Sequence, residues 1–293
     1  MSFRLEMLQV ARLAPSVLGD ATELVRDFLL AQQNPDGGFR DRAGRSDLYY
    51  TVFGIEGIQA LRHEMPRDSL CGFLNRHGDG EGLDFVHLCC LLRCRAACGD
   101  AQTASSREVL RRIETFRTQD GGYNQRAAAP RCTAYACLLG WSAYADAGLV
   151  PPDPEKIATA LHSLQTPDGA FANEPGLPLG TTPATAAGAA LLRHLGRPVP
   201  ESLPLWLLAQ AHPDGGFKAF PGAPMPDLLS TAVALHALDA QLVSRASLKE
   251  KCLDFVDSLW DATGGFHGNW AEDFLDAEYT YYGLLALGHL SLE

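Results

Sequence analysis

The stretch "QQNPDGGFRD", from Gln32 to Asp41, decides the fold of this chain because its core recurs along the sequence. Pro-Asp-Gly-Gly followed by an aromatic residue is typical of a tight turn, since Asp bonds its own backbone and Gly accepts a positive φ without steric cost. Related turns end at Tyr123 ("TQDGGYNQ"), Phe171 ("TPDGAFAN"), Phe217 ("HPDGGFKA") and Phe266 ("DATGGFHG"). Such recurrence indicates a repeat architecture.

The aromatic residues of successive turns are 84, 48, 46 and 49 residues apart. The first interval is about twice the others, so we expect a degenerate copy between Phe39 and Tyr123, and "HGDGEGLD" around Leu83 lies in the right place. That makes six units. Repeats of about 20–50 residues are typical of folds in which one unit cannot bury its apolar face alone.

Each unit pairs two segments with the apolar spacing of helices, one before the turn and one after it. In the first unit, residues 21–33 place Leu24, Phe28 and Leu29 on one face. The second segment begins after Asp47, a favourable N-cap residue. Almost no segment has the pattern of a strand, so the sequence predicts an all-α chain of six helical hairpins.

The second helix of each unit is the richer in small and apolar residues, as in "TTPATAAGAALLRHL" over residues 181–195. A helix that is apolar nearly all round must be covered on both sides, so we expect these helices to lie inside. Six hairpins closed into a ring form an α6/α6 toroid whose inner helices begin around a central cavity. A linear solenoid would need polar caps, whereas the terminal units here are as apolar as the middle ones.

The even repeat predicts a single toroid domain over residues 21–293, preceded by an extension over residues 1–20. The net charge of −11 and the absence of a basic, aromatic-rich stretch argue against a nucleic-acid partner. Arg4, Glu6 and Arg12 interrupt the first apolar stretch, and no later segment has the roughly 18 apolar residues of a membrane span. The eight cysteines form no CxxC pairs and fit buried, reduced thiols, so we expect a cytoplasmic protein.

The repeated turns resemble those of one superfamily, the protein prenyltransferase β subunits together with the squalene–hopene-type terpene cyclases. The resemblance covers nearly the whole chain after the first 20 residues and implies the same α6/α6 toroid. It also implies an isoprenoid substrate and an active centre where the inner helices begin. The repeat is shared by both branches, so it does not choose between a transferase and a cyclase.

Prenyltransferases hold zinc on an Asp-x-Cys-Tyr-Ser-aromatic segment and a later Asp-x-x-His-Thr segment. The best counterpart of the first is "DAEYTY", with Asp276 and with Glu278 in place of the cysteine. The counterpart of the second begins at Asp47 and has Tyr50 in place of the histidine. Because a thiolate-activating zinc site uses Cys and His ligands, we expect no zinc. Mg²⁺ would be needed only if the substrate were a diphosphate.

The diphosphate-binding residues of the transferases also differ here, with Thr181 where a His is expected and Phe220 near the Arg position. "PRCTAYAC" resembles the family's Arg-Ser-Ala-Tyr-Cys, which places Arg131 at a substrate-contacting position. Aromatic residues of the inner helices can hold isoprenoid chains and stabilise cations, or can be ordinary core. The resemblance thus suggests a set of substrate-binding residues: Arg131, Tyr49, Tyr50, Tyr135, Tyr279 and Tyr282.

Protonating cyclases use Asp-x-Asp-Asp-Thr, whose middle carboxylic acid protonates an alkene. "DAEYT" resembles this motif, with Glu278 at the proton-donor position and Asp276 beside it. Burial and a neighbouring carboxylate would both raise the pKa of such a carboxyl. The alternative is that Asp276 and Glu278 are helix-start acids that complement the helix dipole, a role worth about 0.3–1 kcal/mol each.

Three functional hypotheses follow. The first is an isoprenoid-handling enzyme that resembles a prenyltransferase β subunit without its usual zinc ligands, and such subunits pair with a helical-repeat α subunit. The second is a protonation-initiated terpene cyclase with Glu278 and Asp276 as its catalytic residues. The third is a non-catalytic toroid that binds a lipid or a protein.

Overall fold

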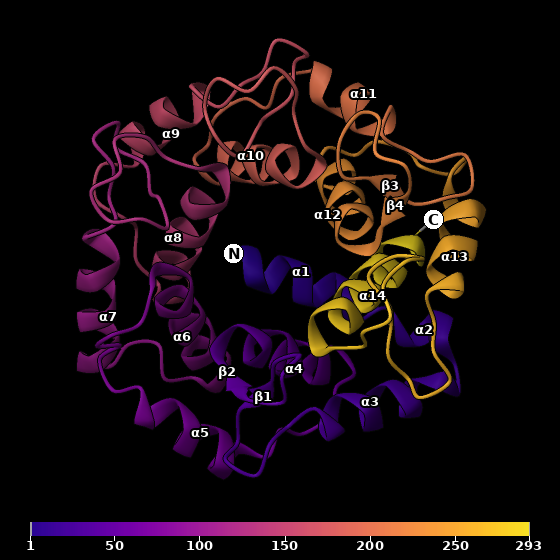
Figure 1. The fold of residues 1–293 in the computed structure, drawn as a ribbon, viewed down its shortest axis with the longest axis horizontal. Helices are drawn as coiled ribbons and strands as arrows, with labels where there is room; N and C mark the ends of the chain where they lie inside the picture. Colours follow the sequence, from indigo (N-terminus) through magenta and orange to yellow (C-terminus); the bar gives the residue numbers. More distant parts are fainter. Residues whose placement is uncertain (1, 293) are drawn as a thin grey trace. The chain divides into compact units, whose positions relative to one another are not determined.

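The computed structural model describes residues 2–292. The chain divides into two compact units: unit one contains the residues up to Arg4 and Arg76–Ala209, and unit two contains Leu5–Asn75 and the residues from Gln210 onward. Both units are built almost entirely from helices (Figure 1). The sequence-based division at residue 20 stays a prediction.

Between Arg76 and Ala209, unit one has six helices arranged in two layers (Figure 1). One layer contains the second helices of three successive repeats side by side, and the other contains helices that pack against them. The first-layer helices are α6 (Phe85–Cys98), α8 (Ala134–Asp146) and α10 (Thr182–His194). The others are α7 (Ala104–Glu114), α9 (Pro154–His162) and α11 (Ser202–Leu208).

Unit two has the same two-layer construction. Its first layer contains α4 (Leu48–Ala60), α12 (Leu228–Asp239) and α14 (Ala277–Leu290), with α14 packed against both of the others. The remaining helices are α1 (Phe3–Ala11), which begins in unit one, α2 (Pro15–Leu18), α3 (Ala21–Ala31), α5 (Arg67–Arg76) and α13 (Lys249–Ser258). Helices α3 and α13 pack against α4 and α14 from the second layer.

Four two-residue strands, all in unit two, form two antiparallel pairs. They are β1 (Phe39–Arg40) with β2 (Ser46–Asp47), and β3 (Phe217–Lys218) with β4 (Pro226–Asp227). Each pair places the turn aromatic opposite the Asp that caps the following helix, as Phe39 lies opposite Asp47. These strands therefore set the start of α4 and α12.

A hydrogen bond from each turn aromatic to the following helix closes the hairpin. The backbone N–H of Phe171 donates to Oγ1 of Thr185 at 3.1 Å, and the hydroxyl returns a bond to the Phe171 carbonyl. The same backbone bond joins Phe39 to Thr51, Tyr123 to the Cys137 thiol, Phe217 to Thr231, and Phe266 to Thr280. The repeated motif thus satisfies a buried backbone donor with the first turn of the next helix.

Glycines in the first-layer helices allow these aromatic rings to pack against the helix backbone. A Cβ placed on Gly54 would lie 2.1 Å from the ring of Phe39, and one on Gly188 would lie 2.7 Å from the ring of Phe171. Gly140 and Gly283 face Tyr123 and Phe266 in the same way. Since a side chain at these positions would overlap the ring, glycine is required by close approach.

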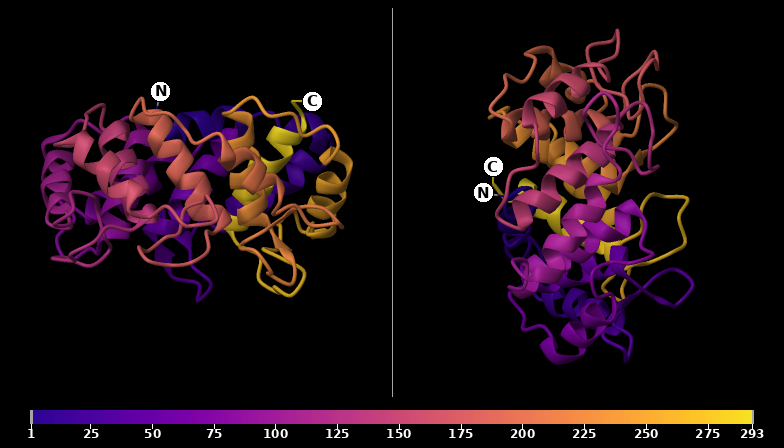
Figure 2. Two further views of the ribbon diagram at one scale, coloured as in Figure 1. Left: turned by 90° about the horizontal axis from the view of Figure 1, so that it is seen from above. Right: turned by 90° about the vertical axis from the view of Figure 1, so that its left-hand side faces the viewer.

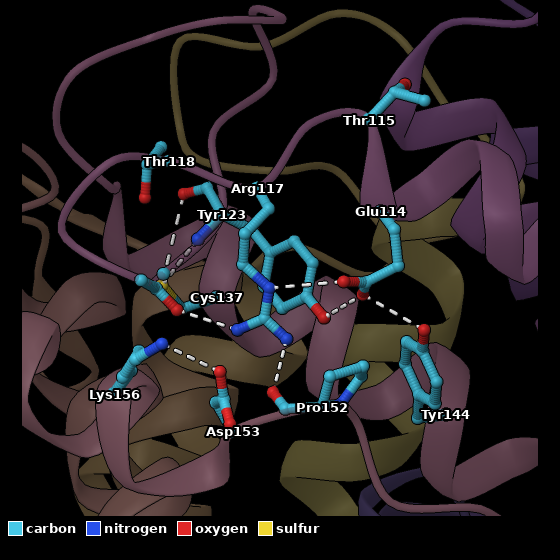
Figure 3. A network of polar contacts seen from close by, with 12 residues as sticks. Glu114, Thr115, Arg117, Thr118, Tyr123, Cys137, Tyr144, Pro152, Asp153 and Lys156 are labelled. Atoms are coloured by element: carbon cyan, nitrogen blue, oxygen red, sulfur yellow. Dashed lines mark hydrogen bonds and ion pairs between the residues drawn. The ribbon is translucent and has the colours of Figure 1, made fainter.

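In unit one, a polar network joins α7, α8 and the loop that leads to α9 (Figure 3). The Glu114 carboxylate accepts hydrogen bonds from the hydroxyls of Tyr123 at 2.6 Å and Tyr144 at 2.9 Å. Arg117 donates to Glu114 and to the Pro152 carbonyl, and its guanidinium lies 4.6 Å from the centre of the Tyr123 ring. Burial and the bond to Glu114 raise the pKa of Tyr123 well above its usual range. The network stabilises the packing of these hairpin segments.

The N-terminal segment packs against the last helix of unit two. Leu8 and Ala11 are buried, and a Cβ on Gly288 of α14 would lie 2.1 Å from the carbonyl oxygen of Val10. None of the helices in residues 2–292 has the length and apolar character needed to cross a membrane.

Candidate active site

A cluster of acidic, basic and aromatic side chains lies at one end of unit two, where α4 and α14 begin. Three segments project from this end: the turn between β1 and β2, the turn between β3 and β4, and the segment before α14 (Figure 2, left). The N-terminal turns of α4 and α14 lie together because the two helices pack side by side in the first layer. The cluster is thus assembled from two hairpins at opposite ends of the sequence.

Asp276 is the N-cap of α14 and is only 2% exposed. Its Oδ1 accepts the backbone N–H of Tyr279 at 2.9 Å, and its carbonyl accepts the Thr280 hydroxyl at 2.7 Å. Its second carboxylate oxygen accepts Nε of Arg42, from the β1–β2 turn, at 3.0 Å. The predicted helix-start role of Asp276 is therefore confirmed, and the same carboxylate also forms an ion pair with Arg42.

Glu278 lies in the first turn of α14, and its Oε1 accepts the hydroxyl of Tyr49 at 2.5 Å. Tyr49 lies in the first turn of α4, two residues after the N-cap Asp47. Burial raises the pKa of Glu278 to about 7; the negative charge of Asp276 adds to this, whereas the Tyr49 hydrogen bond opposes it. Glu278 therefore has the pKa of a group that can hold and release a proton near neutral pH.

The hydrogen-bond partners of Asp276 stabilise its ionised form more strongly than the partner of Glu278 stabilises that of Glu278. The pKa of Asp276 is raised by burial and by the charge of Glu272, and the N–H of Tyr279 and the guanidinium of Arg42 oppose this rise. Burial also raises the pKa of Tyr279 and, with the charges of Asp276 and Glu278, raises that of Tyr50 to about 12. The two tyrosines stay neutral at physiological pH, so proton exchange near pH 7 is confined to the carboxyl pair.

A group of aromatic rings extends from Tyr49, the hydrogen-bond partner of Glu278. The ring of Tyr49 lies 5.0 Å from that of Phe53, which in turn lies 5.4 Å from the ring of Tyr282. Tyr279 packs against Gly268, where a Cβ would overlap its ring at 2.4 Å. Rings of this kind can stabilise a carbocation through their electron-rich faces and can contact an isoprenoid chain.

Unit two brings together most of the residues that the sequence suggested. Glu278, Asp276, Tyr49, Tyr50 and Tyr279 are joined by hydrogen bonds or by the electrostatic interactions described above, and Tyr282 joins them through Phe53. Arg131 and Tyr135 belong to unit one. There, Arg131 is exposed just before α8, and the N–H of Tyr135 donates to the Asn173 side chain.

Sequence reasoning missed Arg42 and Glu272. The guanidinium of Arg42 donates to Asp276 and, through its NH1 nitrogen, to Oε2 of Glu272 at 3.1 Å. It also lies 5.2 Å from the ring centre of Phe274 and 5.6 Å from that of Tyr279. The turn "RDRAGRSD" offers three arginines, and nothing in their spacing indicates that the middle one reaches a residue 234 positions away.

Three of the carboxylate oxygens that could serve as metal ligands here already accept hydrogen bonds within the protein. Asp276 is bonded to Arg42 and to Tyr279, and Glu278 is bonded to Tyr49. Over residues 2–292, no group of three or more His, Cys, Asp or Glu side chains is arranged to hold a metal ion.

Known proteins share this architecture. No curated protein matches the chain in sequence. Among solved structures, it resembles a variant of the type II terpene cyclase MstE from Scytonema, bound to its substrate geranylgeranyl dihydroxybenzoate. That pair has 14% identity and a TM-score of 0.64, with 95% of this chain and 97% of the other covered.

Two other structures are similar to a comparable degree. The Candida albicans protein geranylgeranyltransferase-I, complexed with GGPP, has 13% identity and a TM-score of 0.66, covering 92% of this chain and 90% of its own. A glycosidase variant has 13% identity and a TM-score of 0.63, covering 97% and 98%. Identities this low show a shared fold and do not select a reaction.

A family model described as the prenyltransferase alpha-alpha toroid domain matches residues 6–87, 86–176 and 185–292, which together are most of the chain. The all-α class and the α6/α6 toroid expected from the repeated turns are thereby confirmed. This chain belongs to the prenyltransferase alpha-alpha toroid domain family.

Proposed function

We propose that this protein is a protonation-initiated isoprenoid cyclase in which Glu278 is the proton donor. The observation that carries the proposal is the position of Glu278, a partly buried carboxyl with a pKa of about 7 that accepts the hydroxyl of Tyr49, whose ring packs against that of Phe53. A carboxylic acid that remains protonated near neutral pH can donate to an alkene, and a general acid works best when its pKa is close to the working pH.

The reaction begins with the proton of Glu278. Tyr49 donates to Oε1, so Oε2 carries the acidic proton. This proton adds to the terminal double bond of the isoprenoid; the O–H bond breaks, a C–H bond forms, and a tertiary carbocation results. Internal double bonds then attack the cation in turn and form ring C–C bonds. The last cation loses a proton to solvent water and becomes the alkene product, and Glu278 regains its proton from solvent.

The other site residues stabilise the charges of this sequence. The faces of Tyr49, Phe53 and Tyr282 are suited to the positive charge that moves along the chain. Asp276 adds a negative charge beside the donor. No metal takes part in these steps.

The transferase hypothesis has less support at this site. A prenyl diphosphate requires positive charge beside its leaving group. The guanidinium of Arg42, which lies at the carboxyl pair, is already bonded to the carboxylates of Asp276 and Glu272. A diphosphate there would have to displace two carboxylates while adding negative charge of its own.

The test is isotopic. The protein is incubated in D2O with polyprenols, polyprenyl diphosphates and geranylgeranyl dihydroxybenzoate, and the products are analysed by mass spectrometry. We expect cyclised products carrying one deuterium at the protonated end, lost in Glu278→Gln. The matched control is Glu250→Gln, the same change at an exposed position of α13, which should keep wild-type activity.

Three outcomes would contradict the proposal. Release of diphosphate without deuterium in the product, retained in Glu278→Gln, would select the transferase. Binding of these isoprenoids with no product at all would select a lipid-binding toroid, and binding to none of them would favour a protein-binding one.

A further inference from the structure

Arg42 links two carboxylates to the turn between β1 and β2. Its side chain is about one-third exposed (33%), whereas that of Asp276 is 3% exposed. A partly exposed arginine thus forms an ion pair with a buried carboxylate. The guanidinium donates to Asp276 through Nε and to Glu272 through NH1, and it is flanked by the rings of Phe274 and Tyr279. Four contacts fix the orientation of this one side chain.

Two carboxyls that lie two residues apart on one helix start compete for a proton. Ionising both places like charges close together in a buried site, so the state with one proton is favoured near neutral pH. The partners of each carboxyl decide which of them keeps that proton. Asp276 accepts hydrogen bonds from a guanidinium and a backbone N–H, whereas Glu278 accepts one from a neutral phenol.

We propose that Arg42 is a positioning residue that keeps Asp276 ionised and thereby leaves the shared proton on Glu278. An ion pair stabilises the charged form of a carboxylate far more than a neutral donor does. The effect is mutual: burial lowers the pKa of Arg42, but its bond to Asp276 and the charge of Glu272 outweigh that effect. The assignment of the proton does not depend on the reaction, although its use in catalysis rests on the proposed function.

Other groups also face the pair. Tyr50 on α4 and Tyr279 on α14 have raised pKa values and remain neutral through the relevant range. Glu272 is bonded to the NH1 nitrogen of Arg42. Asp227, the N-cap of α12, acts on Tyr279; burial raises the pKa of Asp227, and its carboxylate accepts the N–H of Ser230.

The experiment follows each carboxyl by NMR. Protein labelled with ¹³C at the side-chain carboxyls of Asp and Glu is titrated from acidic to alkaline pH, through the pKa of Glu278. Asp276→Asn and Glu278→Gln assign the two signals. In the wild type, we expect Asp276 to ionise at lower pH than Glu278, which titrates near 7.

Replacing Arg42 distinguishes a charge effect from a structural one. In Arg42→Gln, the titration of Asp276 should move to higher pH, and Arg42→Lys should reverse most of that change. Arg45→Gln, in the same turn, removes an exposed partner of Asp41 and should leave both signals unchanged. Glu272→Gln tests the other half of the Arg42 contact and should also leave Asp276 ionised.

The proposal is wrong if the titration of Asp276 does not move to higher pH in Arg42→Gln, or if Glu278 ionises before Asp276 in the wild type. A folded Arg42→Gln protein is verified by its far-UV spectrum and its unfolding midpoint. Should that variant not fold, the wild-type titration and Arg42→Lys still decide the order of ionisation. A failure of the cyclase assay with the expected NMR result would reject the reaction and keep the proton assignment.

Discussion

The hydroxyl of Tyr49 lies 2.5 Å from Oε1 of Glu278, although 229 residues separate the two in sequence. The contact joins the first turn of α4 to the first turn of α14. Because a hydrogen bond to the charged form of a carboxyl favours ionisation, Tyr49 lowers the pKa that burial raises. Tyr49 therefore adjusts the pH at which Glu278 loses its proton.

Tyr49→Phe should raise the pKa of Glu278 above its wild-type value of about 7. Activity that depends on protonated Glu278 should then extend to higher pH, with the alkaline limb of the kcat profile moved upward. Tyr144→Phe, which removes a tyrosine–glutamate hydrogen bond in unit one, is the control and should leave the profile in place. An alkaline limb that does not move, or that moves down, would contradict the role of Tyr49.

Glu278 should also make stability depend on pH. Its pKa is about 7 in the folded state and 4.5 in its reference state, so the folded protein binds more protons between these values. Stability from this group is fully present below about pH 4.5 and is lost as the pH rises through 7. Urea unfolding at pH 5 and pH 8 should differ by up to about 3 kcal/mol more in wild type than in Glu278→Gln. An equal difference in both proteins would refute a raised pKa.

Gly54→Ala should destabilise the protein, because its Cβ would lie 2.1 Å from the ring of Phe39. Overpacking of this kind costs about 1–3 kcal/mol. Gly72→Ala is the matched control: Gly72 lies in α5 with no atom within 4 Å of the new Cβ, so it should gain about 0.5–1 kcal/mol in helix propensity. Chemical unfolding of the three proteins measures both effects. Equal stabilities for both variants would mean that the ring does not rest on the helix backbone.

The purified protein should contain well under one zinc per chain after dialysis, as measured by elemental analysis. Cys and His are the ligands of a thiolate-activating zinc site, and Asp276 and Glu278 stand at its counterpart positions with other partners. Stoichiometric zinc that is lost in Glu278→Ala would reverse this expectation and restore the transferase.

Isoprenoids that occupy the aromatic site should raise the melting temperature in a concentration-dependent manner, because a ligand that binds only the folded state stabilises it by mass action. Geranylgeraniol and its diphosphate are the paired probes in differential scanning fluorimetry. We expect the larger shift with the alcohol, given that Arg42 already binds two carboxylates. A larger shift with the diphosphate would count against the proposed cyclase.

Much of the fold could be predicted because its signals are local. In three of the hairpins, those of Tyr123, Phe171 and Phe266, the turn aromatic and the glycine beneath its ring are 17 residues apart. Asp47 was recognisable as a helix cap because it directly precedes an apolar segment, and it accepts the N–H groups of Tyr49 and Tyr50. Each of these interactions forms within one hairpin, so the sequence pattern contains both partners.

The candidate site could be predicted only in part, because its interactions join residues that are far apart in the sequence. The motif "DAEYT" identified Glu278 and Asp276, but their pKa values depend on burial and on residues from the other end of the chain. Arg42 is one of several arginines in an exposed turn, and its sequence surroundings do not distinguish it from Arg45. Only the packing of α4 against α14 brings the side chain of Arg42 to Asp276.

By itself, the sequence determined the helical hairpins and the family, since a turn, a capping residue and a close-packed glycine act over fewer than about 20 residues. Tertiary structure alone decided the electrostatics of the carboxyl pair. Contacts across 229 and 234 residues place a phenol on Glu278 and a guanidinium on Asp276. Two neighbouring acids of similar intrinsic pKa differ in pKa in the folded protein, because a charged partner stabilises the ionised carboxylate more than a neutral partner does. Burial strengthens that difference.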